Sequence, residues 1–200
     1  MLAPTPLPAP SPDPDTVIAQ TRRWLEKAVI GLNLCPFAKA VHVKGQIRYV
    51  VSAATEPAAL RAELAEAMRH LVAADPAQTD TTLLIHPGVL CDFLDFNDFL
   101  GEADELLEDL GLDGTLQVAS FHPQFQFAGT RPDDPGNNSN RAPYPTLHLL
   151  REASVDAAVA AFPEAEAIYE RNIETLQALG QAGWASLFET PAEPPPERPR

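Results

Sequence analysis

The alternation of short apolar segments with longer amphipathic ones most restricts the folds open to this chain. Residues 47–51, 81–85 and 115–121 have the alternation or the apolar composition of β-strands. Between them, residues 55–72 and 92–110 repeat apolar side chains at helical spacing. A strand–helix–strand–helix–strand order implies crossover connections, which set the strands parallel and cover the sheet with helices.

A fourth predicted strand, 146–150, follows the third without a helix between them, so we expect it to run antiparallel. We therefore predict an α/β fold: a single domain with a mixed, mostly parallel sheet of about four strands flanked by helices. The remaining patterns predict helices over 16–32, from Ser154, and over 163–179, and a short strand at 41–43.

Proline is concentrated at the two ends of the chain. Of its 21 prolines, six lie in residues 1–14 and five in residues 191–200. Proline-rich segments adopt extended conformations and bury little surface. We predict disordered tails at 1–14 and 190–200, and a single α/β domain over 15–189.

Composition excludes several classes of protein. A formal net charge of −14 argues against nucleic acid or an anionic membrane surface as the partner. No apolar run approaches the ~18–20 residues of a membrane span. Two cysteines without paired spacing exclude a disulfide scaffold and a CxxC metal site. The first residues lack the pattern of a secretory signal, so we expect a cytoplasmic protein.

Histidines, each followed by proline, end two of the predicted strands at His86 and His122. In open α/β sheets, ligands bind outside the carboxyl ends of the strands. If 146–150 returns from that edge, His148 lies about 10 Å down it, at ~3.3 Å per residue. We expect His122 and His148 to act as acid and base and His86 to contact the substrate. The alternative is that His148 is a core histidine and that His86 only ends a strand.

The 23-residue connection 123–145 has neither a helical nor a strand period. Loops this long in a compact domain are usually functional or disordered, and this one carries aromatic, arginine and asparagine residues. Arg131, Asn140 and Arg141, with Arg151 beyond the next strand, offer donors suited to carboxylate or phosphate. We expect them to bind an anionic small molecule. The alternative is a loop held by its own turns and Arg–Asp pairs.

Cys35 precedes a proline that can begin a helical turn, where free N–H groups stabilise a thiolate. Residues 22–48 contain six Lys and Arg against one Glu, a local charge of +5. Such surroundings lower a thiol pKa and attract an anion, which makes Cys35 a candidate nucleophile. A buried structural cysteine is the alternative. Cys91, with acidic neighbours, is assigned a structural role.

Several segments resemble the bacterial family called domain of unknown function 1415 (DUF1415). They are GLNLCPF at 31–37, DFLDFNDFL at 92–100, SFHPQFQFAGTRPDD at 120–134, NRAPYPTLHLLRE at 140–152 and RNIETLQALG at 171–180. The resemblance implies a bacterial, single-domain, cytosolic protein. It transfers no activity and no catalytic residue.

Three functions remain open from the sequence. The first is an enzyme acting on an anionic small molecule through the histidines and arginines above. The second is a transition-metal site, of the kind zinc prefers, with Cys35, His86, His122 and His148 as candidate ligands. The third is a non-catalytic module that recognises a peptide or protein through 123–145. No nucleotide-binding or metalloprotease motif is present, so no particular cofactor is indicated.

Overall fold

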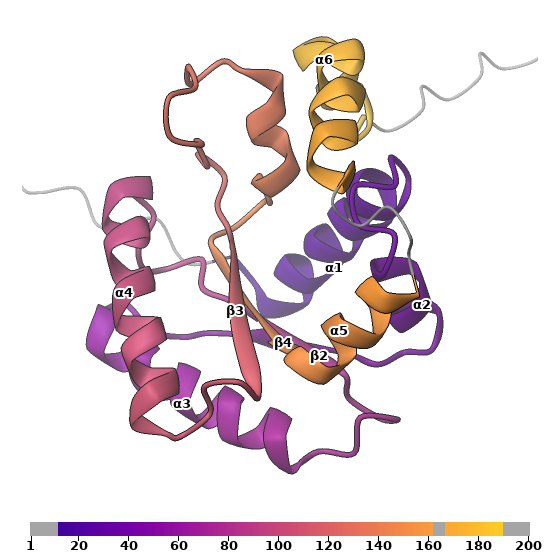
Figure 1. Cartoon of the computed structure of the whole chain (residues 1–200). Coiled ribbons are helices and arrows are strands. Elements are labelled where there is room, and N and C mark those ends of the chain that lie inside the picture. Colours follow the sequence, from indigo (N-terminus) through magenta and orange to yellow (C-terminus); the bar gives the residue numbers. More distant parts are fainter. Residues whose placement is uncertain (1–11, 162–166, 190–200) are drawn as a thin grey trace, which may run out of the picture.

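A four-stranded sheet lies at the centre of the computed structural model, which describes residues 12–161 and 167–189 (Figure 1). The strand order is β1-β2-β4-β3. The strands are β1 (Ile47–Val51), β2 (Thr81–Ile85), β3 (Leu116–Phe121) and β4 (Thr146–Arg151). The structure thus confirms a single α/β domain with a four-stranded mixed sheet.

The direction of the strands corrects the prediction of a mostly parallel sheet. Only β1 and β2 pair in parallel, across the α3 crossover. β4 pairs antiparallel with both β2 and β3. β2 and β3 therefore run in the same direction, as predicted, but β4 lies between them. With no α-helix to carry the chain across the sheet between β3 and β4, the chain turns back and fills the position beside β2.

Helices and helical turns occupy both sides of the sheet. The α-helices are α1 (Pro14–Trp24), α2 (Ala38–Val43), α3 (Pro57–Ala73), α4 (Phe93–Asp109), α5 (Glu152–Ala160) and α6 (Ile168–Ser186). A π-helix, η1 (Leu25–Ile30), continues α1, and a 3₁₀-helix, η2 (Pro135–Asn140), lies within the long connection. Within the described residues, no helix combines the length and the apolar composition needed to cross a membrane.

Some predicted boundaries are wrong. Residues 41–43 belong to α2 rather than to a strand, and Gly45, with φ 69°, turns the chain from that helix towards β1. Asp13 caps α1 by accepting from the Thr16 amide, so the helix begins inside the predicted tail. Gly180 has non-helical backbone angles, with φ 64°, so the predicted helix does end there, but a second helical segment continues α6 to Ser186.

Parts of two predictions lie outside the described residues. They are the predicted tails, apart from residues 12–14, and the start of the last helix at Pro163.

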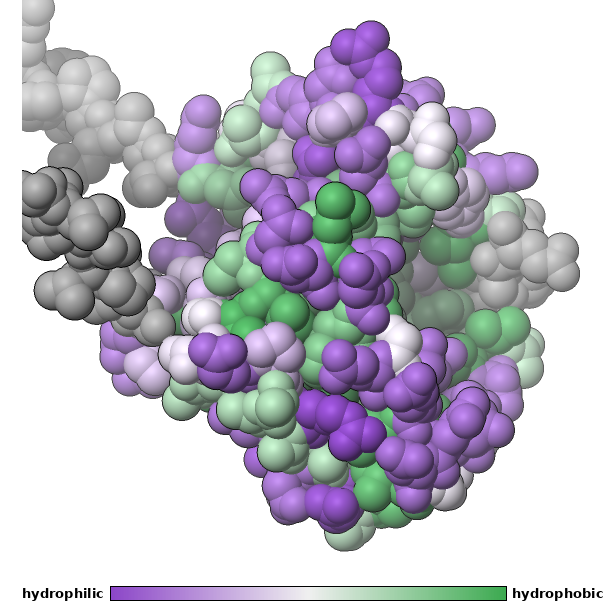
Figure 2. All heavy atoms as spheres, turned by 90° about the vertical axis from the view of Figure 1, so that its left-hand side faces the viewer, coloured by the Kyte–Doolittle hydropathy of each residue, from purple (hydrophilic) through white to green (hydrophobic). Residues whose placement is uncertain are grey.

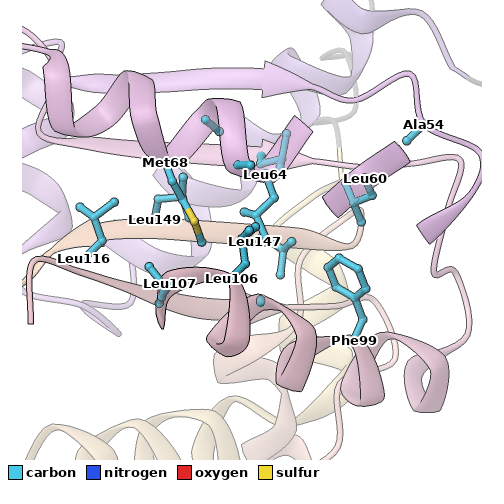
Figure 3. Close-up of a cluster of buried hydrophobic side chains, with 14 of the residues drawn as sticks. Ala54, Leu60, Leu64, Met68, Phe99, Leu106, Leu107, Leu116, Leu147 and Leu149 are labelled. Carbon is cyan, nitrogen blue, oxygen red and sulfur yellow. The ribbon is translucent and has the colours of Figure 1, made fainter. Parts of the chain in front are cut away.

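The main core lies between one face of the sheet and the helices α3 and α4 (Figure 3). Leu60, Leu64 and Met68 of α3 meet Leu147 and Leu149 of β4, and all five are fully buried. Burying a side chain of this size stabilises the fold by about 1.5–3 kcal/mol. The outward side of these helices is largely hydrophilic, as the space-filling view of the α4 side shows (Figure 2).

The opposite face of the sheet is covered less completely. Val17 of α1 packs on Leu83 and Ile85 of β2. Trp24 packs edge-to-face on Phe121 of β3, with ring centroids 5.1 Å apart. Beyond these contacts, α2 and α5 lie over the remainder of this face (Figure 1), where the candidate site is found.

Candidate functional site

A cavity of about 650 Å³ lies on the second face of the sheet, between the strands, η1, α2 and α5. We call it the sheet-face cavity. Most of its lining is apolar, including Val29, Leu83 and Phe121. Two residues predicted as catalytic, Cys35 and His148, both line it. The structure therefore brings together one thiol and one imidazole from distant parts of the sequence.

The turn after η1 places Cys35 at the cavity. Gly31 ends the π-helix where a Cβ atom would lie 2.3 Å from the carbonyl oxygen of Lys27, so only glycine fits. Asn33 then adopts φ 55°, a left-handed conformation that asparagine tolerates. The side-chain amide of Asn172 donates to the Leu34 carbonyl at 2.9 Å and ties this turn to α6.

Burial decides the chemistry of Cys35. It raises the pKa of the thiol above its ordinary value of 9.0, while hydrogen bonds from the Phe37 and Ala38 backbone lower it to a smaller extent. The expected N–H groups are therefore present, but the prediction of a lowered pKa is wrong. Desolvation of the charged sulfur outweighs them. At neutral pH the residue is a thiol.

His148 is held in one tautomer by Thr81. Its Nε2 lies 2.7 Å from Thr81 Oγ1, and that hydroxyl donates to the Leu149 carbonyl at 2.6 Å. A hydroxyl has one proton, so Nε2–H must donate to Thr81 and Nδ1 keeps its lone pair. Burial lowers the pKa of His148 to about 4, so the ring is neutral. Nδ1 has no hydrogen-bond partner among the described residues.

The sheet-face cavity contains little charge. Asp80 is the one charged residue in its described lining, and Ser154 donates to that carboxylate at 2.6 Å. No lysine or arginine of the described residues lines it. An apolar wall with a few polar groups suits a small, largely apolar molecule. Sequence reasoning missed Thr81 and Asp80, because a threonine in a strand and an aspartate before it carry no distinctive pattern.

His86 and His122 lie on the opposite side of the sheet. Both are fully buried and pack against Phe96 of α4, with ring centroids 5.7 and 5.1 Å away. His86 Nδ1 donates to the Val89 carbonyl at 2.9 Å, which leaves Nε2 buried without a partner. His122 accepts from the Gln124 amide at Nδ1, so its Nε2–H donates to a backbone carbonyl of Leu90.

Desolvation keeps both of these buried rings neutral. It lowers the pKa of His86 to about 4 and lowers that of His122 as well. The structure does not bring His122 together with His148, the acid and base expected to act jointly. His148 pairs with Ala119 on one face, and His122, three residues further along, points to the other.

Arg151 holds the end of a helix. Its Nη2 donates to the carbonyls of Leu71, Ala74 and Thr79, at the C-terminus of α3 and just beyond it. These carbonyls lack partners within the helix, and the helix dipole favours a cation there. The guanidinium predicted to bind a substrate is therefore occupied by the protein's own backbone.

The other predicted arginines belong to the connection 123–145. Arg141 donates to the carbonyls of Phe125 at 3.0 Å and Pro132 at 2.7 Å, and thereby closes the loop. Arg131 forms an exposed ion pair with Asp133 at 3.0 Å. Neither residue lines the sheet-face cavity.

Asparagines fix the same loop from inside. The fully buried Asn137 accepts from the Phe127 amide at 3.0 Å, and Asn140 donates to the Ser120 carbonyl at 3.1 Å. Much of the hydrogen-bonding capacity of 123–145 is thus used internally, as the alternative interpretation of the sequence expected.

The four candidate metal ligands do not form one centre. Cys35 and His148 lie on one side of the sheet, and His86 and His122 on the other. Throughout residues 12–161 and 167–189, no group of three or more His, Cys, Asp or Glu side chains is placed to hold a metal ion.

Comparison with known proteins identifies the family of this chain. The family model described as "Protein of unknown function (DUF1415)" matches residues 16–186. The chain belongs to the DUF1415 family. This match covers the sheet, His86, His122 and His148, and the turn that carries Cys35. No curated protein and no solved structure matches the chain.

Proposed function

We propose that this DUF1415 protein is an enzyme acting on a small, largely apolar molecule in the sheet-face cavity. Cys35 is the nucleophile and His148 the proton acceptor. One observation carries the proposal: a thiol and an imidazole with an unpartnered Nδ1 line the same apolar cavity. Covalent catalysis uses a nucleophile and a base at one site, and a ligand bound in this cavity would contact both residues.

The protonation states restrict how such a pair works. The thiol pKa lies above 9.0 and the imidazole pKa near 4, so the resting pair is neutral. Moving the proton from the thiol to the ring before substrate binds is therefore strongly unfavourable. The proton therefore passes from sulfur to Nδ1 as the sulfur–carbon bond forms, while a π bond at that carbon opens and its electron pair moves to the neighbouring substrate atom. Such a pair requires an electrophilic carbon in the substrate.

The backbone beside Cys35 supports this step. Negative charge on the sulfur is stabilised by the hydrogen bonds from Phe37 and Ala38 that already act on the thiol pKa. Thr81 holds the His148 ring with Nδ1 free. A ligand that fills the cavity excludes water from both groups and strengthens these interactions.

Occupancy of the cavity is tested with a neutral fluorescent dye, N-phenyl-1-naphthylamine. Ala158 of α5 lines the cavity, whereas its neighbour Ala157 is exposed and does not. Ala158→Phe fills the space and is expected to weaken dye binding by about tenfold or more. Ala157→Phe adds the same ring outside and is expected to leave binding unchanged. Equal binding by the two variants contradicts the cavity as the binding site.

The reactive pair is tested by alkylation in a Cys91→Ser background, which leaves Cys35 as the one thiol. N-phenylmaleimide is expected to label Cys35 in proportion to time, and bound dye to slow the reaction. His148→Gln keeps a donor towards Thr81 but removes the basic ring nitrogen. Without dye, this variant is expected to be labelled more slowly than the protein that retains His148. Labelling that responds to neither change refutes the proposed roles. Thermal melting of each variant checks that it is folded.

A further inference from the structure

A second cavity, of about 500 Å³, lies between α1, the connection 123–145 and the end of α6. We call it the Arg23–Arg141 cavity after the two cations that line it. Three aromatic side chains, those of Trp24, Trp184 and Phe188, also line it, together with amide, proline and alanine residues. No acidic residue belongs to its described lining. This is unusual in a chain with 28 acidic and 14 basic residues.

Neither guanidinium is neutralised within the described part of the chain. Arg23 donates to backbone carbonyls at the end of α6, including that of Phe188. Arg141 donates to the carbonyls of Phe125 and Pro132. No ion pair between either arginine and a carboxylate occurs among the described residues. The carbonyls fix the two side chains in place and leave both positive charges uncompensated.

The other lining residues indicate the chemistry of the uncharged part of a ligand. Indole and phenyl rings accept a planar aromatic group by stacking. Amides of Asn138 and Gln181 add neutral donors and acceptors. Burial lowers the pKa of Arg141, because its charge is partly desolvated, and an anionic ligand would offset that desolvation.

We propose that the Arg23–Arg141 cavity binds a small organic anion, an aromatic ring that carries a carboxylate or phosphate group. The guanidinium donors left free by the backbone carbonyls bind the anionic oxygens. This proposal is independent of the sheet-face cavity, since the two cavities share only Trp24 among their described linings. It also differs from the anion site expected from the sequence, because Arg131 and Arg151 are absent from it and Arg23 is added.

The experiment compares two related dyes by fluorescence titration at constant ionic strength. 8-Anilinonaphthalene-1-sulfonate is anionic, and N-phenyl-1-naphthylamine is the same ring system without the sulfonate. Arg23→Gln is expected to raise the Kd of the anionic dye about tenfold, as loss of a charge-assisted contact does, with the neutral dye unaffected. Arg22→Gln removes the same charge one residue earlier, outside the cavity, and serves as the matched control.

Arg23→Gln also removes the hydrogen bonds from Arg23 to carbonyls at the end of α6. A second variant leaves those hydrogen bonds in place. Gln20 lines the cavity and accepts from the Tyr144 hydroxyl at 2.7 Å. Gln20→Glu preserves that acceptor and places a negative charge in the lining, so the anionic dye is expected to bind about tenfold more weakly.

Competition then identifies the anionic group. Displacement of the anionic dye by benzoate supports a carboxylate ligand, and displacement by adenosine monophosphate supports a phosphate ligand. The proposal is overturned if Arg23→Gln and Gln20→Glu bind the anionic dye as Arg22→Gln does. It is also overturned if Ala158→Phe weakens binding of the anionic dye, which would place that dye in the sheet-face cavity.

Discussion

Acid should destabilise this protein through His86. The folded protein protonates His86 only near pH 4, because the ring is buried against Phe96 and its desolvation opposes the charge. The unfolded chain protonates it near the ordinary value of 6.5. Unfolding therefore takes up a proton between these values, and stability falls as the pH decreases from 6.5 to 4. The contribution of His86 to this loss is about 2 kcal/mol at pH 5 and approaches about 3 kcal/mol below pH 4.

The assay is urea unfolding at pH 8 and pH 5, followed by circular dichroism. His86→Asn keeps a donor in the place of Nδ1 for the Val89 carbonyl but cannot be protonated in this range. It is expected to be less stable at pH 8, since the stacked ring is lost, but to lose about 2 kcal/mol less than wild type on going to pH 5. His70→Asn, at an exposed position of α3, is the control. A loss in His86→Asn equal to that of wild type refutes the reasoning.

Three other predictions concern Arg151, Asn137 and Cys35. Arg151→Met is expected to lower the free energy of unfolding by about 2–4 kcal/mol, because it leaves the carbonyls at the end of α3 unpaired. Arg61→Met, in an exposed ion pair, should change it by less than about 1 kcal/mol in the same urea titration. Asn137→Ala removes three hydrogen bonds and is expected to speed amide hydrogen exchange throughout 123–145. Alkylation of Cys35 should accelerate with pH to a midpoint above 9.0, and a midpoint near 7 contradicts a desolvated thiol.

Local patterns were enough to predict the four strands and most helices. The apolar run 81–85 became a strand buried at each of its five positions, and Asp92 caps α4 as its type and place suggest. The order of the strands was not accessible in this way. Whether β4 pairs beside β2 or beyond β3 depends on packing between segments far apart in the sequence. Residues 41–43 were assigned to a strand because three residues are too few to separate helical from strand periodicity.

The candidate site was predictable in its residue types but not in its grouping. Cys35 and His148 were both singled out, and both line one cavity. His86 and His122 were placed with them because all three histidines lie near one edge of the sheet. The alternation of side chains along paired strands puts His148 on the other face, and that register requires the structure. Arg151 was predicted to bind a substrate. Its actual partners are backbone carbonyls far away in the sequence, and these cannot be inferred from the residues beside it.

The position of β4 also governs how the sheet is completed during synthesis. β1, α3 and β2 are contiguous in the sequence, so both partners of the parallel pair have been synthesised before β3 and β4. When the nascent chain has reached only the end of β3, β2 and β3 each present an unpaired edge, and nothing yet lies between them. Unpaired edges recruit strands from other molecules. The last of the four strands to leave the ribosome, β4, is therefore the one that closes both edges at once, and we expect a chain truncated before residue 146 to aggregate.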